Sequence, residues 1–359
     1  MRTDVLTLVC CPACGGRLCV ESIADQSDGE IVVGQLGCTG CGQLYPIEQR
    51  LPLLYVNDQR WAPKAREAAG WVGLHKKQGI YEQVEDAVDL KVPYFPEEPW
   101  ITVARHFDAA LDLMALTGRE VILDLGAGRG WAAKHFALRG CRAIAVEIAA
   151  DNQVGIGRAY ALMQHAGVTF DPVIGDSENL PFLPNTFDWV FGAAVLHHTS
   201  DLPAVLRNAY KVLKPGGRLI AINEPCISVD DDPQVVLRRD AADELAFGIN
   251  ENRPNYVDYW MALSIAGFTD IDLFPIDANK KREIDLENWA LALSAIPPRR
   301  TATRHEWLVD LRHHWLRRWR NARKARPLPH PRTKREALIR AIMLNVTSGA
   351  IIVAGKSLS

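Results

Sequence analysis

The sequence predicts an α/β protein in which a doubly wound parallel sheet follows a small cysteine-rich β module. From Val121 onward, apolar runs of strand length alternate with segments of helical spacing, a pattern typical of parallel strands covered by helices on both faces. The first 41 residues, by contrast, contain six of the eight cysteines. A chain of 359 residues is long enough for two such domains and additional segments.

The composition is that of an ordinary globular protein without a dominant charge. Hydrophobic residues make up 48% of the chain and charged residues 23%, and the formal net charge of -2 favours neither nucleic acid nor anionic membrane as a partner. No apolar run reaches the roughly 18–20 residues that span a bilayer. The first residues also lack the apolar segment of a secretory signal, so we expect a cytoplasmic protein.

Two cysteine pairs in the N-terminal module have the spacing of zinc knuckles. Each pair is followed by glycine, as in Cys11-Pro-Ala-Cys14-Gly15, and 23 residues lie between the pairs, enough for one β-hairpin. Four thiolates would complete a tetrahedral structural site with no open position for catalysis. Cys10 and Cys19 could compete as ligands, and four buried free thiols are the alternative to a metal site. The predicted zinc ligands are Cys11, Cys14, Cys38 and Cys41.

The remaining N-terminal elements are short. Apolar runs at Val5–Val9, Glu30–Gly34 and Leu51–Val56 predict β-strands. Residues 57–115 alternate helical and irregular stretches and are rich in aromatic residues. Within them, Tyr94–Trp100 could form one wall of a substrate pocket or simply pack against the core.

Seven apolar runs after the linker predict the strands of the doubly wound sheet. A helix at Leu202–Leu213 precedes the fifth run, and a helix at Tyr256–Ala266 precedes the sixth. The seventh run follows an insertion at residues 280–345. In order, the runs are VILDLGAG, CRAIAVEIA, VTFDPVIGD, FDWVFGAA, GRLIAINEP, TDIDLFPID and GAIIVAGKS.

The turn after the first of these strands, from Asp124 to Trp131, suits close approach to a ligand. Glycines at positions 126, 128 and 130 allow a sharp backbone turn, and N–H groups of the following helix face the ligand. Dinucleotide-binding proteins use the same device, but their fingerprint has a small residue where this chain has Trp131. The turn therefore favours a different nucleoside cofactor.

With these motifs, residues 116–275 and the terminal strand resemble the class I S-adenosylmethionine-dependent methyltransferases. The resemblance implies a Rossmann-like, seven-stranded methyltransferase sheet. It also implies that Asp124 holds the methionine end of the cofactor, Glu147 the ribose hydroxyls and Asp176 the adenine. An isolated acidic residue at a strand end more often caps a helix or is solvated, but here five motifs occur in order. The expected cofactor-binding residues are Asp124, Gly126, Ala127, Gly128, Gly130, Trp131, Glu147, Asp176, Ser177, Glu178 and Ala193.

The cysteine-rich module and the segment LYPIEQRLPLLYV resemble a small zinc-ribbon protein that activates tRNA, rRNA and release-factor methyltransferases. The resemblance covers about 50 residues. It implies a module that stabilises the catalytic domain or presents substrate to it, and it does not identify the methyl acceptor.

Three residues at the ends of the fourth and fifth strands are the candidate catalytic groups. His197 and His198 follow the fourth strand, where the resemblance places the methyl group of the cofactor. Either one could remove a proton from an acceptor hydroxyl near neutral pH, or could instead only pack or cap a helix. Glu224, which ends the fifth strand, is a weaker candidate for the same role.

Motifs of two acceptor classes are missing, and the insertion leaves three interpretations open. The stretch GAAVLHH replaces the asparagine-proline-proline-aromatic motif of adenine and glutamine N-methyltransferases, and Cys226 follows the wrong strand for a cytosine methyltransferase nucleophile. Between Arg299 and Arg340 there are 14 Lys and Arg against 3 Asp and Glu, with interleaved tryptophans. This segment could be a helical lid, a basic face for RNA, or a helix that contacts an acidic or lipid-linked glycan at a membrane surface.

We therefore expect a methyltransferase that acts on a hydroxyl group of a small molecule, sugar or glycan intermediate. The alternatives are an RNA methyltransferase that uses the zinc ribbon and the basic insertion, and a scaffold that binds S-adenosylmethionine without turnover. The predicted organisation is a zinc ribbon (1–56), a helical and aromatic linker and cap (57–115), a cofactor-binding core (116–279), a basic helical insertion (280–345) and the final core strand (346–359).

Overall fold

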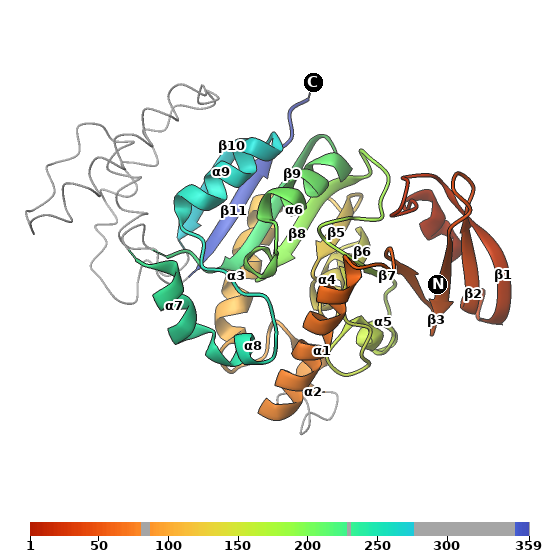
Figure 1. Cartoon of the computed structure of the whole chain (residues 1–359), viewed down its shortest axis with the longest axis horizontal. Helices are drawn as coiled ribbons and strands as arrows, with labels where there is room; N and C mark the ends of the chain where they lie inside the picture. The colour runs from red at the N-terminus through yellow and green to blue at the C-terminus, as the bar shows by residue number, and fades with distance from the viewer. Residues whose placement is uncertain (80–86, 228–230, 276–348, 359) are drawn as a thin grey trace, which may run out of the picture.

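The computed structural model describes residues 1–79, 87–227, 231–275 and 349–358. In these residues eleven strands form one continuous sheet in the order β1-β2-β3-β4-β7-β6-β5-β8-β9-β11-β10. The cysteine-rich module lies at one end of this sheet and the C-terminal strand lies towards the other (Figure 1).

Seven of these strands form the central sheet, as the sequence predicts. Strands β7, β6, β5, β8 and β9 run parallel to one another, and β11 is antiparallel to both of its neighbours, β9 and β10. The order proceeds outward from β5 in both directions, which makes the sheet doubly wound. The central strands are β5 (Val121–Leu125), β6 (Arg142–Glu147), β7 (Asp171–Gly175), β8 (Phe187–Ala193), β9 (Leu213–Glu224), β10 (Thr269–Pro275) and β11 (Ala350–Gly355).

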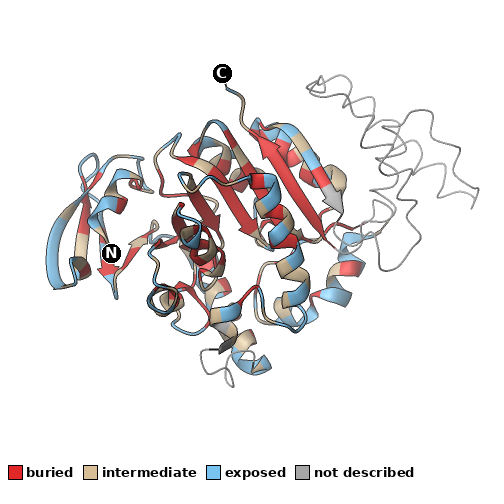
Figure 2. Ribbon diagram, turned by 180° about the vertical axis from the view of Figure 1, so that it is seen from behind, coloured by how far each residue is buried: buried red, intermediate tan, exposed pale blue. Residues whose placement is uncertain are grey.

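Helices cover both faces of the central sheet, and the strands between them are buried (Figure 2). On one face, α3, α4 and α5 pack against residues such as Ile122, whereas α6 and α9 pack against residues such as Leu123 on the other. Burial on both faces explains why these strands are continuous apolar runs instead of alternating patterns. The covering helices are α3 (Trp100–Met114), α4 (Trp131–Leu138), α5 (Ala159–Ala166), α6 (Leu202–Val212) and α9 (Tyr256–Ala266).

The cysteine-rich module joins the central sheet through its last strand. Strand β4 is antiparallel to β3 and parallel to β7, with Leu53 opposite Ile174 and Leu54 opposite Gly175. The module and the core therefore share one ladder of main-chain hydrogen bonds. The strands of the module are β1 (Leu18–Ser27), β2 (Glu30–Cys38), β3 (Leu44–Glu48) and β4 (Leu51–Leu54).

The prediction of a strand at Val5–Val9 is wrong. The structure has a 3₁₀ helix, η1 (Thr3–Thr7), and the main-chain N–H groups of Leu8 and Val9 both donate to the carbonyl of Val5. Only an isolated bridge from Val9 to Phe182 has β geometry among the described contacts of this segment. Valine and leucine favour strands, but here their burial in a core shared with the central sheet determines the conformation.

Helix α1 (Trp61–Gln78) crosses the carboxyl ends of the central strands. It packs closely against the chain after α8 (Ala242–Ala246), because a Cβ added at Gly70 would lie 2.4 Å from the carbonyl oxygen of Phe247. A residue other than glycine at position 70 would push the two segments apart. Two further short helices are α2 (Ala87–Lys91) and α7 (Pro233–Asp240).

The predicted basic insertion at 280–345, with Trp307, Trp315 and Trp319, lies outside the described residues. Within the described part of the chain, no helix combines the length and the apolar character needed to cross a bilayer.

A two-pronged ion pair also connects the module to the core. Arg2 donates from Nε to Asp171 Oδ1 at 3.1 Å and from Nη2 to Asp171 Oδ2 at 2.9 Å. Asp171 begins β7 and is only 4% exposed, and its second basic neighbour, Arg142, is 3.8 Å away. Loss of Arg2 would leave a buried carboxylate with one distant cation.

We predict that Arg2→Ala lowers the free energy of unfolding by about 1–3 kcal/mol, the range for a buried charge that loses its partner at a partly exposed site. Arg17, an exposed arginine of the same module, provides the matched control, and Arg17→Ala should change stability by less than about 0.5 kcal/mol. Urea unfolding followed by circular dichroism measures both. Equal effects of the two substitutions would contradict this account.

Candidate active site and metal centre

The turn between β5 and α4 is held by backbone conformation and by one buried carboxylate. Gly126, Gly128 and Gly130 have φ angles of 60°, 54° and 86°, which favour glycine. A Cβ at Gly126 would lie 2.3 Å from the side chain of Val195, so the turn also needs glycine for space. Asp124 is 2% exposed and accepts a hydrogen bond of 3.0 Å from the N–H of Ala133. Burial raises the pKa of Asp124 to about 8.

Glu147, at the end of β6, is fixed against the same turn. Its Oε2 accepts a 2.8 Å hydrogen bond from the N–H of Gly128, and its Oε1 accepts from the N–H groups of Ile148 and Ala149. A carboxylate can accept about four hydrogen bonds, so capacity remains for a ligand hydroxyl. Burial raises the pKa of Glu147 despite these three donors.

The loop after β7 carries the other predicted acidic residues. Asp176 Oδ1 accepts from the N–H of Glu178 at 2.9 Å, and burial raises the pKa of Asp176. Glu178 Oε1 accepts from Lys64 Nζ of α1 at 2.7 Å and from the N–H of Ser200 at 2.8 Å. Glu178 therefore ties α1 to this loop, a contact that the sequence pattern did not predict. Ser177 lies between these two residues and is partly exposed.

The apolar members of the predicted set occupy two positions. Ala127 is buried in the turn and its N–H donates to Val146 O at 3.1 Å, whereas Ala193 lies half-buried at the end of β8. Trp131 begins α4 and packs edge-to-face on Phe107, with ring centroids 5.0 Å apart. The structure thus brings the ends of β5, β6, β7 and β8 to one edge of the sheet.

His197 is held in the interior by Glu224. Its Nδ1 lies 2.8 Å from Glu224 Oε2, and both residues are buried, Glu224 completely. The same carboxylate accepts from the N–H groups of Val195, Leu196 and His197 and from the hydroxyl of Tyr259. Burial lowers the pKa of His197, and despite burial the contact with His197 lowers the pKa of Glu224. Glu224 therefore holds the segment after β8, with its acceptor capacity already used.

His198 has a different environment. Its Nδ1 lies 3.0 Å from Asn250 O and 3.1 Å from Glu251 Oε1. Both neighbours are acceptors, so Nδ1 carries the proton and Nε2 keeps a lone pair. Burial opposes protonation of the ring, but Glu251 outweighs it and raises the pKa of His198. Glu251 is itself buried and paired with Arg253.

Helix α1 adds two side chains to the surroundings of His198. Trp71 meets the imidazole edge-on, with ring centroids 4.9 Å apart. Glu67 is 5% exposed and is close enough to His198 and Glu147 to interact with their charges. Burial raises the pKa of Glu67 to about 7. Sequence reasoning missed Glu67, Trp71 and Glu251, because they come from separate segments that carry no motif.

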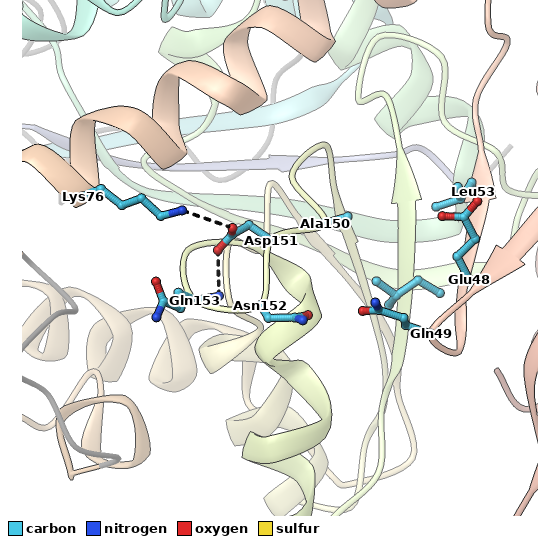
Figure 3. A pocket seen from close by; sticks show the side chains of 9 residues that line it. Glu48, Gln49, Leu53, Lys76, Ala150, Asp151, Asn152 and Gln153 are labelled. Atoms are coloured by element: carbon cyan, nitrogen blue, oxygen red, sulfur yellow. Dashed lines mark hydrogen bonds and ion pairs between the residues drawn. The ribbon is translucent and has the colours of Figure 1, made fainter.

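A cavity of about 540 Å³ lies where α1, the β3–β4 turn and the loop after β6 meet (Figure 3). Its lining includes Leu51 and Leu53 of β4, and the ion pair between Lys76 and Asp151 crosses its other side. The cavity is thus formed jointly by the cysteine-rich module and the core, and it is separate from the histidines.

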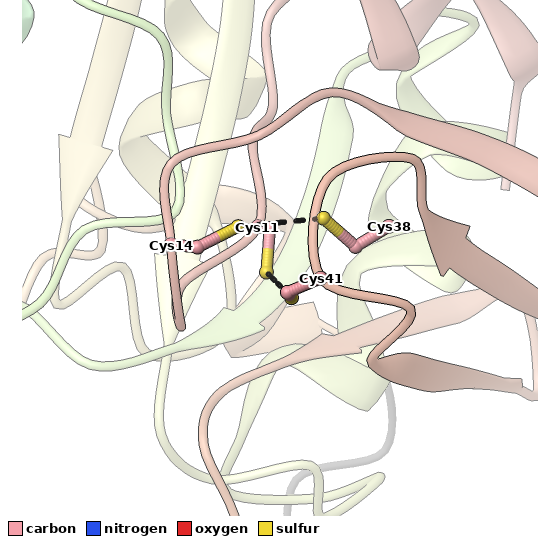
Figure 4. Close-up of side chains that lie close together, drawn as sticks. All are labelled: Cys11, Cys14, Cys38 and Cys41. Carbon is pink, nitrogen blue, oxygen red and sulfur yellow. Dashed lines mark hydrogen bonds between the residues drawn. The ribbon is translucent and has the colours of Figure 1, made fainter.

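The four predicted zinc ligands converge on one point (Figure 4). The sulfur atoms of Cys11 and Cys41 lie 3.7 Å apart, those of Cys14 and Cys38 lie 3.5 Å apart, and all four lie within 4.8 Å of one another. Four sulfur atoms about 2.3 Å from a zinc ion would be separated by about 3.8 Å in a tetrahedron. The geometry therefore fits a structural zinc, and neither Cys10 nor Cys19 belongs to the cluster.

Hydrogen-bonding groups surround three of the four sulfur atoms. The N–H groups of Gly16 and Gly40 point to the sulfur atoms of Cys14 and Cys38 at 3.4 and 3.3 Å. Donation from the main chain lowers the pKa of Cys38 to about 6. The buried hydroxyl of Tyr45 lies 3.0 Å from the sulfur of Cys11, where it can orient that ligand from outside the cluster.

We predict that the purified protein contains about one zinc ion per chain, as expected for a closed site of four thiolates. Cys38→Ser should lose the zinc and lower stability, because metal binding contributes to folding. Cys19→Ser is the matched control, since Cys19 belongs to the same module but lies outside the cluster, and it should keep the metal. Elemental analysis by mass spectrometry decides, and zinc retained by Cys38→Ser would refute the ligand set.

Two family models match separate parts of the chain. Residues 123–221 match the family model "Methyltransferase domain", and residues 2–49 match "Trm112p-like protein". The chain is 30% identical over 153 residues to the biotin biosynthesis bifunctional protein BioHC of Cellvibrio japonicus, covering 39% of this chain and 29% of that protein. It is 32% identical over 128 residues to the malonyl-[acyl-carrier protein] O-methyltransferase of Yersinia pestis, covering 33% and 45%.

The chain spans less than half the length of these two relatives. Among solved structures, a complex of the Haloferax volcanii Trm112 methyltransferase activator with a methyltransferase is similar at a TM-score of 0.42 and 16% identity, covering 77% of this chain and 100% of that one. One chain therefore combines a region similar to the methyltransferase domain family, at residues 123–221, with a region similar to Trm112p-like proteins, at residues 2–49, in which four cysteines cluster.

Proposed function

We propose that this protein is an S-adenosylmethionine-dependent methyltransferase that methylates a hydroxyl group of a small molecule or sugar unit. The observation that supports it most is the row of Asp124, Glu147 and Asp176 at the ends of three adjacent parallel strands around a glycine-rich turn. Ligands of doubly wound sheets bind at this edge. The family match at 123–221 supports the same activity.

The residues fit the proposed cofactor on the evidence of their own contacts. Asp124 is buried beside the first turn of α4, where the methionine end would lie, and Glu147 keeps acceptor capacity for ribose hydroxyls. Asp176 closes the row on the side of the zinc ribbon. S-adenosylmethionine would supply an electrophilic methyl group, and the protein has to orient the acceptor, exclude water and remove its proton.

His198 is the residue we propose as proton acceptor. Its Nε2 lone pair is available because Nδ1 donates towards Asn250 O and Glu251. Glu251 would stabilise the imidazolium that forms, and Trp71 would limit water at the ring. His197 and Glu224 would act only as positioning residues, since their polar atoms are engaged with each other and with the backbone.

The choice of acceptor class rests on the same residues. A hydroxyl loses its proton as it attacks the methyl group, so it needs a proton acceptor of near-neutral pKa. A thiolate or a carbanion attacks with its proton already removed. A Yersinia pestis relative is named as an O-methyltransferase, whereas a Dinoroseobacter shibae relative, UbiE, is named as a C-methyltransferase. The Trm112p-like match favours RNA as the second candidate acceptor.

We predict that calorimetry detects binding of S-adenosylmethionine, and that Glu147→Ala weakens it about 10- to 100-fold, the usual cost of losing hydrogen bonds to a charged group. Glu147→Gln, which still accepts hydrogen bonds, should bind more tightly than Glu147→Ala. The control is Glu48→Ala, because Glu48 lines the separate cavity. Binding of a pyridine dinucleotide in place of S-adenosylmethionine would overturn the proposal.

Radiolabelled cofactor incubated with fractionated cell extract identifies the acceptor class. We expect label in small-molecule or lipid-linked fractions, with little dependence of the rate on salt. Label in RNA, with a rate that falls steeply as salt rises, would instead favour the RNA methyltransferase. If the protein binds the cofactor but no fraction is labelled, the result would favour a scaffold that binds S-adenosylmethionine without turnover.

The proposed base predicts a specific pH dependence. Methyl transfer should rise with pH as His198 loses its proton, and His198→Ala should lower kcat by about 10²- to 10⁴-fold. Glu251 raises the pKa of His198, so Glu251→Gln removes that effect and should move the rise to lower pH. The other charged and titratable groups that interact with His198 are the same in both proteins, so Glu251 is the variable; they are His197, Glu67, Glu147 and Glu224. A rise at the same pH in Glu251→Gln would exclude His198 as the base.

A further inference from the structure

The loop from Asp176 to Leu183 lies between the proposed cofactor site and the zinc cluster. At its far end, it pairs with the chain that leads into the first zinc knuckle. The N–H of Cys10 donates to Pro181 O at 2.9 Å, and the N–H of Leu183 donates to Leu8 O at 2.8 Å. The loop that begins with a proposed adenine-binding residue is therefore attached to the zinc ribbon by main-chain hydrogen bonds.

Asn179 connects the two ends of this arrangement. Its side-chain Nδ2 donates to Pro12 O at 3.0 Å, and Pro12 lies inside the knuckle between Cys11 and Cys14. Its own main-chain N–H donates to Asp176 O at 3.0 Å. One residue thus contacts both the backbone between two zinc ligands and the backbone of the acidic residue at the cofactor site.

The position of Pro12 O depends on the knuckle, and the knuckle depends on the metal. Cys14 is exposed, and a Cβ added at Gly16 would lie only 3.0 Å from the sulfur of Cys38, so the turn is tight but has little packing around its tip. A bound zinc ion would join the four thiolates, whereas without the metal the cysteines take up protons and no bond joins the two knuckles. Loss of zinc would therefore free the carbonyl to which Asn179 donates.

We infer that Asn179 is a positioning residue through which zinc in the ribbon strengthens cofactor binding at Asp176. The inference rests on the proposed function, because it assumes that S-adenosylmethionine binds at this edge of the sheet. Coupling between two binding sites is reciprocal. S-adenosylmethionine must then raise the affinity for zinc by the same factor by which zinc raises the affinity for S-adenosylmethionine.

The test measures zinc retention by the full chain in place of catalysis. Protein loaded with zinc is titrated with a chromogenic chelator, with and without saturating S-adenosylmethionine. In the unsubstituted protein, S-adenosylmethionine should raise the chelator concentration at half-release about 3- to 10-fold, the effect of about one hydrogen bond. In Asn179→Ala this ratio should fall below about twofold, because the bond to Pro12 is lost.

Asn208→Ala is the matched control. Asn208 Nδ2 also donates to this loop, to Glu178 O at 2.7 Å, but it comes from α6 and does not contact the knuckle. This variant can bind the cofactor more weakly, yet it should keep the 3- to 10-fold ratio. Circular dichroism of each variant verifies that it is folded before titration.

The outcomes separate this inference from the proposed function. Absence of calorimetric binding of S-adenosylmethionine to the unsubstituted protein means that the proposed function fails. If S-adenosylmethionine binds but leaves the chelator concentration at half-release of zinc unchanged, the inference fails while the proposed function stands. The inference is also overturned if S-adenosylmethionine raises this chelator concentration equally in Asn179→Ala and in the unsubstituted protein. Loss of the effect in Asn208→Ala overturns it as well.

Discussion

Two residue pairs of parallel β-structure, Leu53 with Ile174 and Leu54 with Gly175, determine where the zinc ribbon and helix α1 lie relative to the sheet. Because the pairing is parallel, β4 ends at the same edge as β7, beside Asp176. The chain that leaves β4 must therefore continue at the edge where ligands of such sheets bind. Helix α1 then crosses that edge and contacts the loop after β7 through Lys64. The proposed cofactor site, helix α1 and the cysteine cluster thus become neighbours through one short strand.

Buried carboxylates at this edge differ in how much acceptor capacity they retain. Glu224 accepts from three main-chain N–H groups, from His197 and from Tyr259, so its acceptor capacity is used within the protein. Among the described residues, three main-chain N–H groups donate to Glu147, and burial raises its pKa. Burial removes hydrogen bonds that water would make to the Glu147 carboxylate, and a ligand hydroxyl that donates to this carboxylate would replace one of them. The two carboxylates thus differ in how many hydrogen bonds they already accept within the protein. A carboxylate with acceptor capacity left can bind a ligand, whereas one without it can only stabilise the fold.

The sequence predicted those features of the fold and site that depend on local patterns. Apolar runs located the seven central strands, and cysteine spacing located Cys11, Cys14, Cys38 and Cys41. The pattern at Val5–Val9 failed, since strand propensity was outweighed by burial in a shared core. Glu67 and Glu251 could not be found, because each acquires its role from a contact with His198 that folding creates and no spacing records. For the same reason, no motif distinguished His198 from its neighbour His197.

The residues around the proposed base come from two parts of the chain, one inside the region that matches the methyltransferase family and one outside it. The methyltransferase match spans 123–221, which includes Asp124, Glu147 and His198 but neither α1 nor Glu251. The two outer segments are locked together, since Gly70 lies directly against the carbonyl of Phe247. Both segments contact His198, one through Trp71 and the other through Glu251. Relatives that share the matched region are named for acceptors as different as a sterol and an acyl-carrier protein. Groups that contact the proposed base therefore come from segments outside the matched region as well as from within it.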